Sequence, residues 1–149
     1  MNNVFHVRSW IAAAALTGAV AVLAGCQSMS PMMMMGQQVA LSGANEVPAV
    51  TTSASGSGTV AIKEDRSVSA TITVTGMTAT AAHIHEGAAG VNGPVIVPFT
   101  KTGDNTFAAP AGATLTDAQY AAYKAGGLYV NVHSAKNPGG EVRAQLKGN

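Results

Sequence analysis

The sequence predicts a mainly β fold, an antiparallel Greek-key sandwich or barrel with one short helix near 116–125. Three observations lead to this class. Short runs with a period of two recur along the chain, which is typical of strands with one buried face. Gly-rich segments separate these runs, and only one segment carries helix-capping residues.

The clearest predicted strand spans 67–75, where four apolar residues alternate with Ser and Thr. A turn at 64–66 separates it from a preceding run at 59–63. The segment at 137–140 contains Pro followed by two Gly and predicts a hairpin, because Pro restricts φ and Gly accepts positive φ. The strands predicted along the chain are 59–63, 67–75, 81–85, 94–99, 128–133 and 141–147.

The predicted helix begins at a capping box. Thr116 and Gln119 have the spacing at which each side chain caps a backbone amide of the other residue. Gly126 and Gly127 supply a stop signal. We therefore expect a short helix at one end of the sheets.

The N-terminus predicts export. Arg8 precedes an apolar run of about 15 residues, shorter than the ~20 that a membrane-spanning helix needs. Residues 1–25 are therefore interpreted as a signal peptide. The ending Leu23-Ala24-Gly25-Cys26 resembles the lipobox of bacterial lipoproteins, which implies a lipid on Cys26 and an anchor outside the cytoplasm. Gln27 after the cysteine favours the outer membrane; a conventional signal peptide with an unmodified cysteine is the alternative.

Charge and cysteine content exclude several classes. Cys26 is the only cysteine, so the chain forms no internal disulfide and the folded domain has no catalytic thiol. Removing Arg8 with the signal leaves seven basic residues against seven acidic ones (8 − 1 = 7). Without a basic field, nucleic acid is not an expected partner.

Residues 26–38 are predicted to form a Met-rich tether before a domain at 39–149. Met32, Met33, Met34 and Met35 are consecutive, and thioethers are soft ligands that favour Cu(I). The alternative for this run is a flexible apolar linker.

Three histidines are the candidate metal ligands. His83 and His85 share a strand face at positions i and i+2, while Ile84 points into the core. His133 lies with Tyr129 and Asn131 opposite the apolar stripe of its strand. If the two strands are neighbours, three imidazoles converge, and imidazole suits Cu(II) and Zn(II).

A histidine network without metal is the alternative, hydrogen-bonded to Glu86, Glu141 and Arg143. Arg143 has two interpretations of its own: it orients an anion beside a metal, or it forms an ion pair with Glu86 or Glu46. The glycines at 87–93 follow a strand and open no helix, so they predict a turn and no nucleotide loop. No catalytic residue is assigned.

Several segments resemble the CHRD domain family. They are LSGANEVP at 41–48, the glycines at 56–58, HIHEGAAGVNGPVIVPF at 83–99, and LTDAQYAAYKAGGLYVNVHSAKNPGGEVRAQL at 115–146. CHRD domains are in turn distantly similar to Cu/Zn superoxide dismutase, a Greek-key β-sandwich.

That second resemblance implies copper on the three histidines, with Arg143 near an open coordination position. Residues 86–98 contain no further His and no Asp for a zinc site, and a single cysteine cannot form the enzyme's disulfide. The leading hypothesis is therefore a membrane-anchored binding module, with copper as the candidate ligand. The alternatives are a structural or interaction module without metal, and a copper-only dismutase-like redox enzyme.

Overall fold

The computed structural model describes residues 36–148. The predictions that concern the signal peptide 1–25, Cys26, Met32–Met35 and all but the last residues of the tether 26–38 lie outside the described residues. Within them, no helix is both long enough and apolar enough to cross a membrane.

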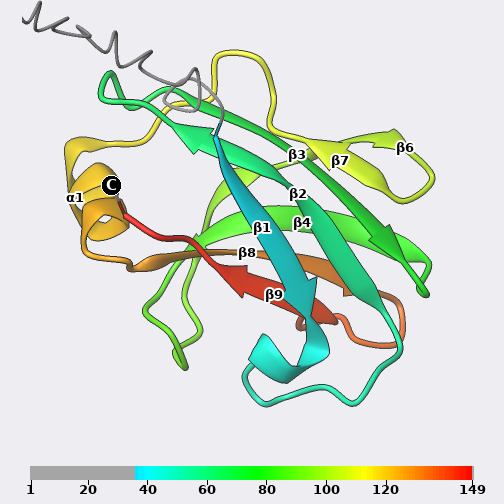
Figure 1. Cartoon of the computed structure of the whole chain (residues 1–149). Coiled ribbons are helices and arrows are strands. Elements are labelled where there is room, and N and C mark those ends of the chain that lie inside the picture. The colour runs from blue at the N-terminus through cyan, green and yellow to red at the C-terminus, as the bar shows by residue number, and fades with distance from the viewer. Residues whose placement is uncertain (1–35, 149) are drawn as a thin grey trace, which may run out of the picture.

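The described chain forms nine strands, one α-helix and one 3-10 turn (Figure 1). In chain order these are β1 (Gln37–Ser42), η2 (Gly43–Asn45), β2 (Ser55–Ile62), β3 (Val68–Thr75), β4 (Ala79–Glu86), β5 (Val95–Pro98), β6 (Thr100–Gly103), β7 (Thr106–Ala108), α1 (Asp117–Lys124), β8 (Leu128–Ser134) and β9 (Val142–Gln145).

All nine strands belong to one antiparallel sheet in the order β5-β4-β8-β9-β1-β2-β3-β7-β6. The sheet curls until its edge strands β5 and β6 approach each other, and only Phe99 separates these two strands in the chain. The pairs β3-β7, β4-β8 and β1-β9 join strands that are not consecutive, so crossover connections link the two halves. The mainly β, antiparallel, barrel-like prediction is confirmed.

Most predicted elements form where expected. The capping box is complete, because the Thr116 hydroxyl accepts from the Gln119 amide and the Gln119 side chain accepts from the Thr116 amide. Three strands were not predicted: β1, β6 and β7. Only Val39 and Leu41 give β1 an apolar period, and every residue of β6 is exposed, so neither strand has the alternation on which the prediction relied.

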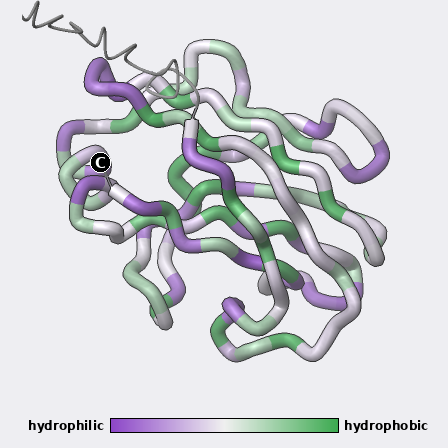
Figure 2. Tube along the Cα trace, in the orientation of Figure 1, coloured by the Kyte–Doolittle hydropathy of each residue, from purple (hydrophilic) through white to green (hydrophobic). Residues whose placement is uncertain are grey.

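The core fills the inside of the curled sheet. Ile72, Ile84, Val130 and Val142 are completely buried there, and Phe107 of β7 belongs to the same core cluster. Figure 2 shows hydrophobic residues recurring along the strands, and hydrophilic residues in connecting segments and on parts of strands such as the start of β1.

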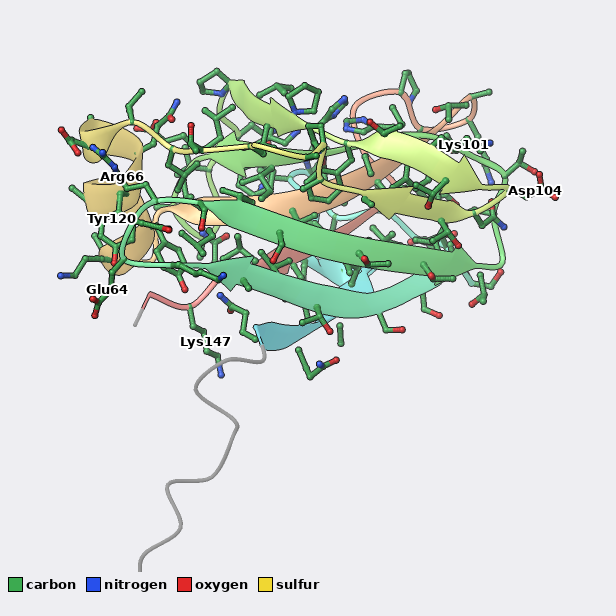
Figure 3. The ribbon with its side chains drawn as sticks, turned by 90° about the horizontal axis from the view of Figure 1, so that it is seen from above. Glu64, Arg66, Lys101, Asp104, Tyr120 and Lys147 are labelled. Atoms are coloured by element: carbon green, nitrogen blue, oxygen red, sulfur yellow. The ribbon has the colours of Figure 1, made fainter. Side chains whose placement is uncertain are left out.

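The charged residues labelled in Figure 3 lie at the periphery of the sheet. Among them Arg66, in the β2–β3 turn, pairs with Asp117 at the start of α1. This contact connects the helix to the end of the sheet.

Candidate metal centre

The three histidines come from neighbouring strands. β4 pairs with β8 so that His83 lies opposite Asn131, His85 opposite Tyr129, and Ala81 opposite His133. Residues between them, such as Ile84 and Val132, face the core and are fully buried. The imidazoles therefore project from the opposite face of the sheet, as the period of two predicted.

The imidazoles form one cluster. One ring nitrogen from each histidine lies within 4.8 Å of those from the other two. His83 Nδ1 and His133 Nε2 are 3.0 Å apart. His85 and His133 are buried and His83 is half-buried, so the cluster reaches solvent on the side of His83.

Backbone carbonyls determine the tautomers of two rings. His85 Nδ1 lies 2.9 Å from the Gly93 carbonyl oxygen, and His133 Nδ1 lies 2.9 Å from that of Pro138. A carbonyl oxygen only accepts, so both Nδ1 atoms carry hydrogen and both Nε2 atoms of the neutral rings carry lone pairs. Histidines that bind metals are oriented by outer hydrogen bonds of this kind.

Two rings of the cluster, those of His83 and His85, have lowered pKa values. Burial first, and then the neighbouring His133 and His85 rings, lower the pKa of His83 to about 4. Burial also lowers the pKa of His85, against the opposing effect of its hydrogen bond to Gly93. Both rings are therefore uncharged at pH 7, which is the state that coordinates metals.

The donor set fits a metal ion. His85 Nε2 is buried and has no hydrogen-bond partner among the described residues, although its lone pair is available. Metal–imidazole bonds are about 2 Å long, so two nitrogens on one ion lie at most about 4 Å apart. The 3.0 Å between His83 Nδ1 and His133 Nε2 satisfies this limit. The largest nitrogen–nitrogen separation in the cluster is at most 4.8 Å, so ring rotation needs to bring the nitrogens closer by at most about 1 Å.

Arg143 lies beside the cluster and is 1% exposed. Its guanidinium stands 3.4 Å from the centre of the Tyr129 ring and donates to the carbonyls of Ala88 and Val91. It makes no ion pair with Glu46 or Glu86, since Arg66–Asp117 is the one salt bridge within residues 36–148. The predicted ion pair of Arg143 is therefore wrong: loop carbonyls and an aromatic ring replace the carboxylate.

Glu141 and Glu86 do not contact the histidines through hydrogen bonds. Glu141 is buried and accepts from Thr52 Oγ1 at 2.7 Å and from Ser134, whose hydrogen bond lowers the pKa of Glu141. It thereby supports the β8–β9 turn that carries the Pro138 carbonyl. Glu86 ends β4 and is half-buried.

A histidine network does exist, but with different partners from those predicted. His83 contacts His133, and His85 and His133 contact backbone oxygens. The carboxylates do not take part because Glu141 is engaged by hydroxyl groups.

Sequence reasoning did not single out Asn131 and Glu46 as site residues. Both are buried, and Asn131 Oδ1 and Glu46 Oε1 lack partners within residues 36–148. The Asn131 amide lies near enough to act on the pKa of both His85 and Glu46. Burial raises the pKa of Glu46 to about 7, although Arg143 opposes this rise. Asn131 had a signal, its place on the face of His133. Glu46 lies in a loop, and it was considered only as an ion-pair partner of Arg143.

A groove of about 770 Å³ runs along β1 and β9, bordered by Arg143 and Glu46 but by none of the three histidines. The candidate site is therefore the cluster itself, partly covered by the loops 87–93 and 135–141.

Fold and site together define an antiparallel, barrel-like β domain with a three-histidine cluster on the outer face of β4 and β8. The model of the CHRD domain family matches residues 37–146, and the chain belongs to this family. No curated protein matches the chain. No solved structure matches it either.

Proposed function

We propose that this chain is a CHRD-domain module that binds copper through His83, His85 and His133. The observation that carries the proposal is the unpartnered, buried Nε2 of His85 beside two further imidazole donors. Imidazole binds copper and zinc, and copper stands above zinc in affinity for a given site. A bound copper ion would supply a Lewis acid and a one-electron redox centre.

The chain's own residues prepare the cluster for an ion. Gly93 and Pro138 orient two rings so that both Nε2 atoms carry lone pairs. The Nε2 of His85 has no hydrogen-bond partner among the described residues, and that of His133 faces His83 Nδ1 at 3.0 Å. Burial keeps His83 and His85 uncharged at neutral pH. His83 is the most exposed of the three, so an ion and any ligand from solvent would arrive on that side.

Copper analysis of the purified protein tests the proposal. Full-length protein is dialysed against Cu(II) and then against buffer, and its copper content is measured beside that of a His83→Ala/His85→Ala variant. We expect about one copper per chain in the wild type and a residual amount in the variant. Equal, negligible copper in both would refute the proposal.

One observation favours a second function, that of a structural or interaction module without metal. The 3.0 Å contact between His83 Nδ1 and His133 Nε2 is a satisfactory hydrogen bond by itself. In that case His133→Ala lowers stability, while copper and chelators leave the melting temperature unchanged.

We also propose that the module is held outside the cytoplasm by a lipid on Cys26, in the outer membrane. The lipobox-like ending and the apolar run before it support this placement. Labelling with a clickable palmitate analogue should mark the wild type and leave Cys26→Ser unmarked. A variant that still sediments with membranes and still carries the label would contradict the anchor.

A further inference from the structure

Tyr129 lies at the centre of a three-layer stack. Its ring is nearly parallel to that of His85, with 8° between the planes and 4.8 Å between the centroids. The Arg143 guanidinium stands 3.4 Å from the centre of the Tyr129 ring. Cation–π and ring stacking both favour this arrangement. Tyr129 is 2% exposed, yet it lies outside the hydrophobic core cluster.

The Tyr129 hydroxyl reaches the residue that orients His85. The Gly93 amide donates to this hydroxyl at 3.1 Å, and the hydroxyl lies 3.5 Å from the Gly93 carbonyl oxygen. The same carbonyl accepts from His85 Nδ1 at 2.9 Å. Tyr129 therefore contacts His85 directly and also holds its hydrogen-bond acceptor.

Other side chains hold the rest of this loop. Arg143 donates to Ala88, Val91 and Asn92. Gln145 donates to the Gly87 carbonyl at 2.9 Å. These contacts attach the loop 87–93 to β9. At the end of the loop the Pro94 carbonyl accepts from the Glu86 amide at 3.1 Å, and the Tyr129 hydroxyl accepts from the Gly93 amide itself.

We infer that Tyr129 is a positioning residue of the candidate metal centre, which keeps His85 in the Nδ1–H tautomer by holding the Gly93 carbonyl in place. The consequence for metal binding rests on the proposed function; the consequence for the tautomer does not. Without the hydroxyl, the Gly93 amide loses its partner and the Gly93 peptide shifts. His85 then populates the Nε2–H tautomer, whose Nε2 cannot bind a metal.

The test is Tyr129→Phe, which removes the hydroxyl and keeps the stacked ring. Long-range ¹H–¹⁵N spectra of the metal-free, full-length protein report the tautomer of His85. We expect a single Nδ1–H form in the wild type and a mixture with the Nε2–H form in the variant. Affinity for Cu(II) should fall about 10-fold, in the range typical of lost outer-shell contacts.

Tyr123→Phe is the matched control. Tyr123 is also buried, and its hydroxyl accepts from Gln37, away from the histidines. This variant should keep both the His85 tautomer and the copper affinity. An unchanged tautomer in Tyr129→Phe would overturn the inference. If the wild type binds no copper, the proposed function fails, and the tautomer comparison still decides the role of Tyr129.

Discussion

Burial gives His83 and Glu46 opposite contributions to the pH dependence of stability. His83 loses charge on burial, and Glu46 keeps its proton up to a pKa of about 7. For Glu46 the folded state binds the proton more tightly than the unfolded state, whose pKa is near 4.5. Its contribution to stability is therefore fully present below pH 4.5 and is lost as the pH rises through 7. His83 acts the other way: its folded pKa is depressed, so stability falls as the pH falls from 6.5 towards 4.

Glu46→Gln isolates the carboxyl from the histidines, because both proteins keep His83 and His85. Glutamine resembles the protonated acid, so the two proteins should be similarly stable at pH 5. At pH 8 the variant should be more stable by up to about 3 kcal/mol, the value of a 2.5-unit shift at a residue 6% exposed. Urea unfolding at both pH values measures the difference. Parallel pH profiles of the two proteins would show that folding does not raise the pKa of Glu46.

The β8–β9 turn supplies the Pro138 carbonyl that orients His133. Two adjacent glycines in this turn differ in the space around them. Gly140 has φ +129°, and a Cβ there would lie 2.6 Å from both Asn131 Nδ2 and Glu46 Oε1. A Cβ on Gly139 would meet nothing within 4 Å. The hairpin was predicted from its Pro and Gly content, but the sequence did not distinguish the two glycines.

Gly140→Ala should destabilise the domain by at least about 2 kcal/mol, since strained backbone and overpacking each cost about 1–3 kcal/mol. It should also displace Asn131 and disturb the spectra of His85. Gly139→Ala is the control and should stay within about 0.5 kcal/mol of the wild type. Denaturant unfolding of the three proteins provides the comparison. Equal effects of the two substitutions would contradict this description of the turn.

At the scale of the whole molecule, the curled sheet makes β4, β8 and β9 neighbours, with the core on one face and the polar cluster on the other. Loops then cover that second face. An ion bound there would be held by two strands that are far apart in the chain, so it should stabilise the folded state only.

Free copper at 100 times its dissociation constant should therefore add about 2.7 kcal/mol of stability and raise the melting temperature on the order of 10 °C. A chelator should reverse this rise. The His83→Ala/His85→Ala variant should not respond, which separates the site from general copper binding. Thermal melts with and without copper measure the effect, and an equal rise in both proteins would place the copper elsewhere.

The alternation in 67–75, the capping box at 116–119 and the i, i+2 spacing of His83 and His85 were sufficient to predict the fold class, the helix and the shared face of these two residues. These features are local: a period of two or a cap needs only adjacent residues. Strands β1 and β6 lacked such a period, and backbone pairing with β2 and β7 defines them.

Tertiary structure alone decided what the polar residues contact. The distance between His83 and His133, the stacking of Tyr129 between His85 and Arg143, and the absence of an ion pair on Arg143 in the described chain depend on strand order and register. Residues 50 positions apart meet only because β8 lies beside β4. A sequence pattern specifies the face of each strand, but the partner across that face follows from how the whole sheet closes.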